Sequence, residues 1–509
     1  MPRSKSGSPA FNVGLLIVLH LLIVVPLAYA LNIWADEAST LYSTQHGFFE
    51  AFQNAGANEK QAPLYFWVMA LWRDLDGSIF FARVFSVICS AVSIKLFADL
   101  ARRLFDTRAA LLVTAFFALH PFLIWASLEI RVYALVILIS IALISLFHST
   151  FIEETEPSPL KYAAFTLLAA VGLYTNYYIA FPLAGMFVAL VLTQRWRKAT
   201  ILAALGAIAF AVFIPALLAA RSQLAANTGG YQEPRLLIEG LRTLWHHFLT
   251  LILPAGVFAD GDSGLPIVIR VWAVRIALVI LAVFAVKNRR SLSQRSLILG
   301  VIAAVCVASL LGSYFVLGER YLEIRHATVL FVPLLLAAAS IIADVFGGEK
   351  VSISKLLTFA GGALVLASFA YSLTVLYPGS TKRGDWARIG QYIEDNEKPG
   401  QPIVVFTVFD GLALPYHYHG MNKILPDHGY FDYDLEAEFG TSDSLKKQTD
   451  FVVSQIPPES SEIWLAVSEK CTATAACEPL DNFIRSHYTV ELEQQFYLEK
   501  LYLLRRNTQ

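Results

Sequence analysis

Charged residues are scarce in this chain, and so are cysteines. Of its 509 residues only 16% are Asp, Glu, Lys or Arg, whereas 56% are hydrophobic, and the mean hydropathy is +0.56. So few charges exclude an ordinary soluble or disordered protein and are typical of a chain that crosses a membrane several times. The 39 basic and 40 acidic residues nearly cancel, so no basic excess indicates a nucleic-acid partner. Four cysteines are too few for a disulfide-rich scaffold.

The cysteines fall into two pairs with different surroundings. Cys89 and Cys306 lie inside apolar runs, where a thiol usually serves as a small packing residue. Cys471 and Cys477 lie in a polar C-terminal segment. If that segment faces an oxidising compartment, we expect these two to close a small disulfide loop, with two free thiols as the alternative.

Long apolar runs dominate the first three quarters of the chain. Eleven of them approach or exceed the roughly 17 residues that cross a bilayer core. They fall near residues 11–31, 79–101, 109–127, 132–151, 161–176, 178–194, 199–220, 266–286, 296–317, 326–345 and 354–377. The stretch 161–194 is long enough for two spans, broken around Tyr174–Tyr178. Ala62–Trp72 is too short to span and predicts a helix lying at the membrane interface. We interpret the first run as an uncleaved span, with a signal peptide as the alternative, because Leu31–Trp34 has no small-residue cleavage pattern.

The basic residues between the runs predict the topology. With a cytoplasmic N-terminus, nearly every basic cluster between spans lies on the cytoplasmic side, as the positive-inside rule requires. These residues are Arg102, Arg103, Arg108, Lys161, Arg195, Arg197, Lys198, Lys287, Arg289, Arg290, Arg295, Lys350 and Lys355. Counting Ala62–Trp72 as a span would reverse every later loop. An odd number of spans places the tail outside the membrane.

We therefore expect a mainly α protein with two domains. Residues 1–377 form a polytopic transmembrane helical bundle of about 11 spans, with interfacial helices in its first outer loop, 32–78. Residues 378–509 form a small extracytoplasmic α/β domain. In it, Pro402–Phe406 and Ile463–Val467 have the pattern of buried strands, and 385–393 has helical periodicity.

Unusual polar residues collect on the predicted outer side. Asp36 and Glu37 directly follow the first apolar run, and two adjacent carboxylates at the mouth of a membrane helix are costly there. Further charged residues of this side are Glu50, Glu59, Lys60, Glu129, Arg131, Glu319, Arg320, Glu323, Arg325, His326, Lys382, Arg383 and Asp385. Arginine suits bidentate phosphate recognition, and a carboxylate can serve as a general base or a metal ligand. A membrane-surface substrate with a phosphate, an apolar tail and a nucleophile to deprotonate would use both.

Each part also has a purely structural interpretation. Asp36–Glu37 can cap an interfacial helix that begins at Ala38, since carboxylates are favourable at helix N-termini. Glu129–Arg131 can hold an ion pair at the end of a span. The cations of Arg320–His326 can extend to lipid headgroups, and Arg83 can anchor the outer end of its span. No ligand spacing around His246–His247 indicates a metal site.

Several stretches, taken in order, resemble a known group of enzymes. Trp34–Ala38 after the first span resembles the start of the polytopic C-type (GT-C fold) glycosyltransferases, in particular a bacterial family related to protein O-mannosyltransferases and lipid A aminoarabinose transferases. The other matching stretches are Ala62–Phe66 with Leu71-Trp72, Arg83–Ser86, Glu129–Ala134, Glu319–Leu322 followed by Phe331–Pro333, and Asp385-Trp386. Three features depart from the family pattern. Gln61-Ala62 precedes Pro63 where many relatives have a histidine and a second proline, Glu129 stands where some branches have Asp, and Glu323–His326 replaces apolar residues.

The resemblance implies a set of roles. The family uses polyprenyl-phosphate sugars and usually inverts the anomeric centre. Asp36 would be the general base that deprotonates an acceptor hydroxyl, and Glu37 would orient it or help to bind the acceptor. The donor phosphate would be bound by Arg131, Arg320 and Arg325, and supporting residues would be Glu129, Tyr133, Arg83, Tyr321 and His326. Loop 221–265 would close over the substrate.

The prediction from these observations is a membrane glycosyltransferase of the plasma (inner) membrane. It would move a sugar from a polyprenyl-phosphate donor to an envelope glycolipid, glycan or protein on the extracytoplasmic side. No cofactor is required by the sequence, and a divalent metal is compatible with it, although Gln61-Ala62 weakens the case for a metal site. The alternative from another class is a transporter or flippase of lipid-linked sugars, which the absence of an internal repeat disfavours. A non-catalytic scaffold that keeps the fold is a third alternative.

Overall fold

The computed structural model describes residues 13–59, 61–153, 157–228, 237–252, 292–317, 326–346, 367–382, 384–431, 442–468, 471, 477–507 and scattered positions between 272 and 287. The chain divides into two compact units, Met1–Tyr29 with His46–Leu376, and Ala30–Gln45 with Tyr377–Gln509. The second unit begins its long segment at Tyr377. It also includes Ala30–Gln45, the segment that carries the acidic pair.

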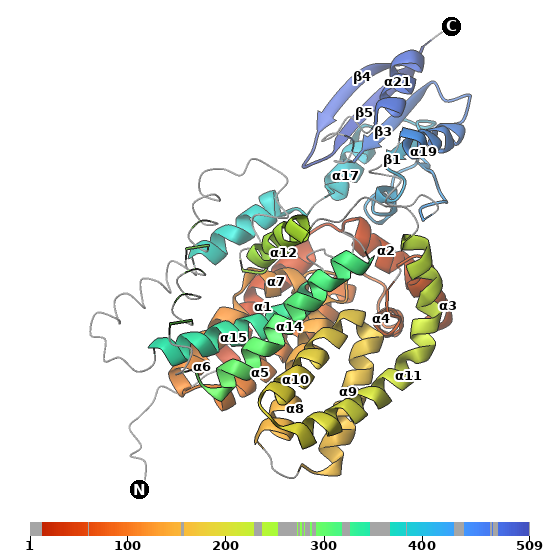
Figure 1. The fold of residues 1–509 in the computed structure, drawn as a ribbon. Coiled ribbons are helices and arrows are strands. Elements are labelled where there is room, and N and C mark those ends of the chain that lie inside the picture. The colour runs from red at the N-terminus through yellow and green to blue at the C-terminus, as the bar shows by residue number, and fades with distance from the viewer. Residues whose placement is uncertain are drawn as a thin grey trace. The chain divides into compact units, whose positions relative to one another are not determined.

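The first unit is helical throughout its described part (Figure 1). Its helices are α1 (Val13–Ala30), α3 (Phe48–Ala57), α4 (Leu64–Arg73), α5 (Ile79–Leu104), α6 (Thr107–Ala118), α7 (Pro121–Ser127), α8 (Tyr133–Phe147), α9 (Pro159–Thr175), α10 (Ala180–Leu192), α11 (Trp196–Thr228), α12 (Leu237–Ile252), α14 (Gln294–Leu317) and α15 (Thr328–Phe346). A π-helical turn, η1 (His148–Glu153), continues α8, and a 3-10 turn, η2 (Tyr177–Ile179), precedes α10.

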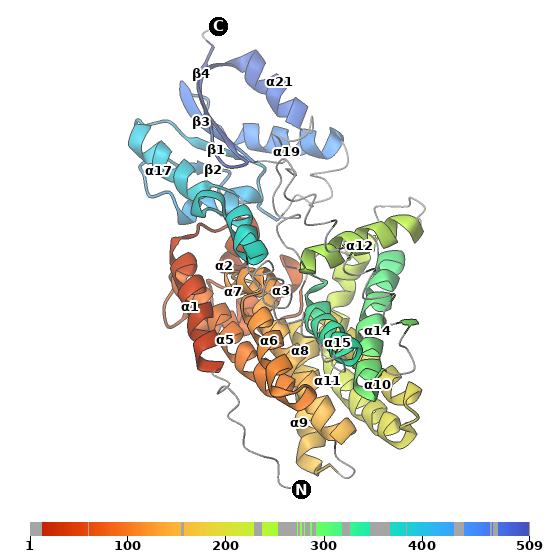
Figure 2. The same cartoon turned by 90° about the vertical axis from the view of Figure 1, so that its left-hand side faces the viewer.

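These helices pack in a bundle because nearly all their faces are apolar. Helix α5 packs against α8, α8 against α15, α10 against α14, and α14 against α15 (Figure 2). Stacked rings of Phe97 and Phe117, 4.2 Å apart, join α5 to α6. Among the described residues, five helices are long and apolar enough to cross a membrane, and six if α6 and α7 form one span. The predicted runs 266–286 and 354–377 lie largely outside the described residues, so eleven spans remains a prediction.

Two interruptions of the apolar runs have local causes. The run 109–127 is not one straight helix, since α6 and α7 meet at a bend of 50°. His120 caps α7 by accepting a hydrogen bond from the Phe122 amide, and Pro121 occupies the first turn, where its missing N–H is not needed. The run 161–194 breaks as expected, because Asn176 leaves the helical conformation and its side chain accepts from the Tyr178 amide.

The second unit contains a five-stranded mixed sheet in the order β2-β1-β3-β5-β4. Its strands are β1 (Ile403–Phe406), β2 (Ile424–Leu425), β3 (Glu462–Val467), β4 (Tyr488–Gln495) and β5 (Lys500–Arg506). Its helices are α2 (Ala35–Ser43), α17 (Trp386–Asn396), α19 (Ser442–Ser454) and α21 (Glu478–His487), with short 3-10 turns η5 (Pro378–Ser380), η6 (Asp410–Leu412) and η7 (Leu414–Tyr416). The first three strands in this order pair in parallel, and β5 pairs antiparallel with β3 and β4. The two buried strands predicted from the sequence are β1 and β3.

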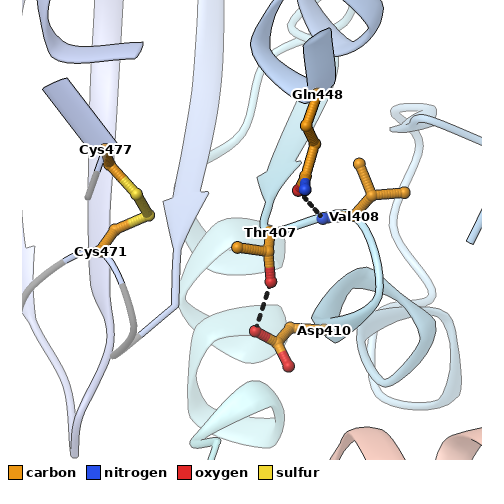
Figure 3. Close-up of a disulfide and its surroundings, with 6 residues drawn as sticks. All are labelled: Thr407, Val408, Asp410, Gln448, Cys471 and Cys477. Carbon is orange, nitrogen blue, oxygen red and sulfur yellow. Dashed lines mark hydrogen bonds between the residues drawn. A yellow bond between two sulfur atoms is a disulfide. The ribbon is translucent and has the colours of Figure 1, made fainter. Parts of the chain in front are cut away.

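Helices cover both faces of this sheet (Figure 2). Side chains of β1 and β3 pack with Val452 of α19 and Leu480 of α21 on one face. On the other face, the ring of Tyr392 in α17 meets Trp464 edge-on, as the alternation of side chains along β3 requires. Beside the first face, Cys471 and Cys477 form a disulfide (Figure 3), the outcome favoured from the sequence.

Candidate active site

The acidic pair lies in the first turn of α2, within the second unit. Trp34 precedes the helix in an extended conformation and provides no side-chain cap. The first amide groups of a helix carry partial positive charge, so the carboxylates of Asp36 and Glu37 are favourable at this end. The helix begins at Ala35 and not at Ala38, so the pair lies within its first turn and does not cap it. The favourable position of the carboxylates at this end of the helix does not exclude a chemical role.

The two carboxylates nevertheless have different surroundings. The Glu37 side chain is fully buried, and its Oε2 lies 2.9 Å from Nζ of Lys382, which is also buried. Asp36 keeps part of its surface exposed. Successive residues of an α-helix point about 100° apart, so one residue can face the interior of the unit while its neighbour faces outward. A buried carboxylate needs a paired cation, and Lys382 supplies it.

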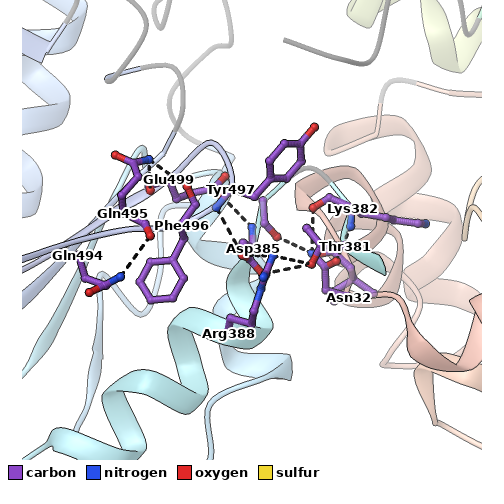
Figure 4. A network of polar contacts seen from close by, with 12 residues as sticks. Asn32, Thr381, Lys382, Asp385, Arg388, Gln494, Gln495, Phe496, Tyr497 and Glu499 are labelled. Carbon is purple, nitrogen blue, oxygen red and sulfur yellow. Dashed lines mark hydrogen bonds and ion pairs between the residues drawn. The ribbon is translucent and has the colours of Figure 1, made fainter. Parts of the chain in front are cut away.

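The segment that carries Lys382 is hydrogen-bonded to Asn32, which lies three positions before α2 begins at Ala35. The Asn32 side-chain oxygen accepts from the Lys382 amide at 2.7 Å, and its NH₂ donates to the Gly384 carbonyl. Gly384 has a φ of +77°, so the chain turns sharply between Lys382 and α17. Figure 4 shows Asn32 beside Thr381 and Lys382, with Asp385 next in the network.

A second polar group lies in the first unit. Arg131 donates from Nη1 to Oε2 of Glu59 at 2.6 Å, and both side chains are nearly inaccessible to solvent. Glu129 is 2% exposed, and its backbone carbonyl accepts from the Ser86 hydroxyl at 2.7 Å. Arg83, one turn before Ser86 on α5, is fully buried and donates to the Ala28 carbonyl of α1. Three of the predicted site residues, Arg83, Glu129 and Arg131, thus belong to the interior of this unit.

Two supporting residues make ring contacts in the same unit. Tyr133 begins α8 and stacks on Trp125 of α7 with ring centres 4.7 Å apart. His326 precedes α15 and stacks on Tyr178 at 4.8 Å. The latter contact joins the start of α15 to the break between α9 and α10, so His326 has a packing role in addition to any contact with a lipid headgroup.

Several predicted site residues lie outside the described residues. They are Arg320, Tyr321 and Arg325, together with much of loop 221–265. His246–His247 lies on α12, and nothing is described of these two side chains. Where the acidic pair lies relative to the arginines therefore remains a prediction, since the pair and Arg131 belong to different units.

Sequence reasoning placed Lys382 among the outer cations and gave it no role. The structure shows that the Lys382 side chain pairs with Glu37 and that its backbone amide donates a hydrogen bond to the Asn32 side chain. The available signal was a lysine five residues after the last apolar run, in a chain with few charges. For metals, no group of three or more His, Cys, Asp or Glu that could hold an ion occurs within the described part of the chain.

Comparisons with known proteins agree with the resemblance noted from the sequence. Residues 60–218 match the family model described as dolichyl-phosphate-mannose-protein mannosyltransferase. The fold matches ArnT from Cupriavidus metallidurans in its apo state, with a TM-score of 0.56, 13% identity, and coverage of 97% of this chain and 98% of that one. The same protein bound to undecaprenyl phosphate matches with a TM-score of 0.54, the same identity and the same coverage. No curated protein matches the chain in sequence.

Proposed function

We propose that this chain, which its family match and fold indicate to be a membrane glycosyltransferase of the GT-C type, uses a polyprenyl-phosphate sugar as donor. The acceptor is a hydroxyl of an envelope glycolipid such as lipid A or lipopolysaccharide, of a glycan, or of a protein. Transfer takes place on the extracytoplasmic side of the plasma (inner) membrane and inverts the anomeric centre. The ArnT structure with undecaprenyl phosphate supports a polyprenyl phosphate as the carrier, since that protein has the same fold.

The observation that carries this proposal is the different burial of the two carboxylates in the acidic pair. Glu37 is buried and neutralised by Lys382, whereas Asp36 keeps exposed surface at the N-terminal turn of α2. A general base must reach the hydroxyl that it deprotonates, and the partly exposed carboxylate of Asp36 can do so more readily than the buried one of Glu37. Asp36 is therefore the base, and Glu37 holds its helix in place.

The reaction needs few protein groups. Asp36 takes the proton of the acceptor hydroxyl, the oxygen attacks the anomeric carbon, and the bond to the donor phosphate oxygen breaks on the opposite face. Cations that stabilise the departing phosphate supply the remaining catalysis. We assign this task to Arg320 and Arg325. Arg131 is the third candidate, with its guanidinium oriented by Glu59.

A single carboxylate base suffices for this inverting displacement. Arginines can supply the positive charge that a metal would otherwise bring to the phosphate. The proposal therefore needs no metal, and a divalent ion would add to the same electrostatic stabilisation. Adding a chelator to the purified protein tests this point directly.

The test is transfer by purified protein in lipid nanodiscs, with a panel of polyprenyl-phosphate sugars and envelope acceptors. Asp36→Asn keeps the shape of the side chain and removes the base, so we expect transfer to fall by about 10²–10⁴-fold. Asp74→Asn is the matched control, because Asp74 is an exposed carboxylate of the same predicted outer loop.

Two outcomes would contradict the proposal. Transfer by Asp36→Asn at the wild-type rate would show that the base lies elsewhere. In the second outcome, the protein transfers no sugar from any donor and moves lipid-linked sugars between the leaflets of proteoliposomes. That result would replace the transferase proposal by the transporter alternative.

A further inference from the structure

Asn32 and Ile33, which lie just before α2, both hydrogen-bond to residues of the C-terminal segment of the second unit. Asn32 is 4% exposed and is clamped between the Lys382 amide and the Gly384 carbonyl. The next residue, Ile33, donates its amide to Nε2 of His417 at 3.2 Å. Two consecutive residues upstream of the helix are thus held, Asn32 through its side chain and Ile33 through its backbone amide, and their three partners come from the C-terminal segment of the chain.

Lys382 engages this segment through its backbone and through its side chain. Its amide is bound by Asn32, and its ammonium group reaches Glu37, about one helical turn further along. Both Lys382 and Glu37 are at most 4% exposed as side chains. Because the pair is shielded from water, its attraction is screened far less than that of a surface ion pair.

Lys382 is itself anchored to the sheet by the residues that follow it. Asp385 is fully buried, and its amide donates to Oε2 of Glu499 at 2.8 Å. Its carboxylate accepts from the Thr381 hydroxyl, from Nε of Arg388 and from the Tyr497 amide. Figure 4 shows this network running from the turn between β4 and β5 to Asn32. A continuous set of polar contacts therefore connects the sheet, through Lys382, to the first turn of α2.

We propose that Lys382 is a positioning residue of the transfer reaction, which fixes the carboxylate of Asp36 by binding and neutralising the adjacent Glu37. This inference rests on the proposed function only through the role of Asp36. It extends the residues that serve the reaction from the acidic pair to the C-terminal segment of the same unit. It also assigns a role to the C-terminal segment, which carries Lys382 and the polar contacts that hold it.

The physical reason is the shared backbone of residues 36 and 37. Without Lys382, Glu37 would be a buried carboxylate with its cation removed, and it would have to take up a proton or move toward water. Either change releases or shifts the first turn of α2. A general base works only within hydrogen-bond reach of its proton, so a shift of about 1 Å is enough to lower the rate by roughly 100-fold.

The experiment compares Lys382→Met, Lys382→Arg and the control Arg505→Met in full-length protein in nanodiscs. Arg505 pairs with Glu462 and Glu491 on the sheet of the same unit, so its removal reports general loss of an ion pair there. For Lys382→Met we expect kcat to fall about 100-fold, with KM for the polyprenyl-phosphate sugar changed by less than about threefold. Lys382→Arg should recover most of kcat, and Arg505→Met should leave it unchanged.

Amide hydrogen exchange of residues 36–41 provides a readout that does not need the reaction. We expect faster exchange in Lys382→Met and wild-type protection in the other two variants. Wild-type kcat in Lys382→Met would overturn the inference, and so would a loss of kcat with α2 still protected. An Arg505→Met variant that loses kcat equally would also overturn it, because the effect would then be a general one.

The two proposals fail in different ways. If wild-type protein transfers no sugar while Lys382→Met exposes α2 to exchange, the proposed function is wrong and the link through Lys382 stands. If wild-type protein transfers sugar while Lys382→Met changes neither kcat nor exchange, the link is wrong and the function stands.

Discussion

The two units each bury an ion pair, and the pairs differ in what accompanies them. In the second unit, Glu37 pairs with Lys382, and the residue next to Glu37 in the chain, Asp36, is partly exposed. In the first unit, Arg131 and Glu59 are accompanied by Glu129, which is itself buried. The carboxylate beside the Glu37–Lys382 pair is thus partly exposed, whereas the carboxylate beside the Arg131–Glu59 pair is not.

The comparison also separates two uses of the same chemistry. Glu59 orients the guanidinium of Arg131, a group predicted to bind phosphate, whereas Lys382 neutralises Glu37, a group predicted to assist a base. Removing one partner of a buried pair strands the other charge, and removing both at once is far less damaging.

The largest effect is expected from single removals. Arg131→Met and Lys382→Met each leave a buried carboxylate without its cation and should lower the free energy of unfolding by about 3–5 kcal/mol. Denaturant titration of each variant measures this loss. Adding Glu59→Gln to Arg131→Met should restore most of the stability, since the stranded charge is then gone.

The same double variant sharpens the assignment of Arg131. If Arg131 binds the donor phosphate, Arg131→Met/Glu59→Gln should be well folded and yet bind the polyprenyl-phosphate sugar more weakly, by about 1.5–3 kcal/mol for a lost charge-assisted hydrogen bond. Wild-type donor affinity in that variant would make the pair purely structural. Donor titration by calorimetry distinguishes the two results.

A smaller loss of stability is expected from removing the Cys471–Cys477 disulfide of the second unit. Cys471→Ser/Cys477→Ser opens a loop closed at a sequence separation of 6. The loop-entropy relation gives a loss of about 2 kcal/mol for so short a loop. Only the unfolding of the second unit should shift, and the helical transition of the first unit should stay in place. Circular dichroism melts with and without reductant check this, and a shift of both transitions would show that the units unfold together.

The smallest effect concerns a partly exposed pair, Glu462 with Arg505. A hydrogen bond from Gln401, together with Arg505, lowers the pKa of Glu462 below its model-peptide value of 4.5. The pair therefore contributes stability that is complete above that value and is lost as the pH falls through the lower folded-state pKa. Because the pair is partly screened by water, we expect less than about 1 kcal/mol. Glu462→Gln should flatten the stability profile of the second unit below pH 4.5, and an unchanged profile would contradict the shift.

Local features of the fold were predictable from the sequence because they depend on short-range chemistry. Length and composition located α5 and α8, and the Asn176 break between α9 and α10 follows from its side chain competing with the helix. The alternation and apolarity of β1 and β3 identified them as buried strands. The bend between α6 and α7 was missed because the run was judged by its length, although Pro121 marks it.

The candidate site was predictable only in part. The distribution of basic residues among the loops predicted that the acidic pair and Lys382 lie on the same side of the membrane, and this prediction needed no tertiary information. The pairing itself joins residues far apart in the chain, as the separation of 350 between Asn32 and Lys382 illustrates. No local pattern specifies such a contact, since it depends on how the tail folds around its own sheet. The same holds for Arg131 and Glu59, which a sequence shows only as two charges of opposite sign.

The central claim is that Asp36, and not its neighbour, takes the proton. The most direct test is single-turnover sugar transfer at saturating donor by Asp36→Asn and by the double variant Glu37→Gln/Lys382→Met. The double variant removes the buried charges together, so the fold of α2 should survive and transfer should stay well above that of Asp36→Asn, which should fall by about 10²–10⁴-fold. A double variant in which α2 stays protected from amide exchange and which yet transfers as little sugar as Asp36→Asn would assign the chemistry to Glu37 and contradict the account.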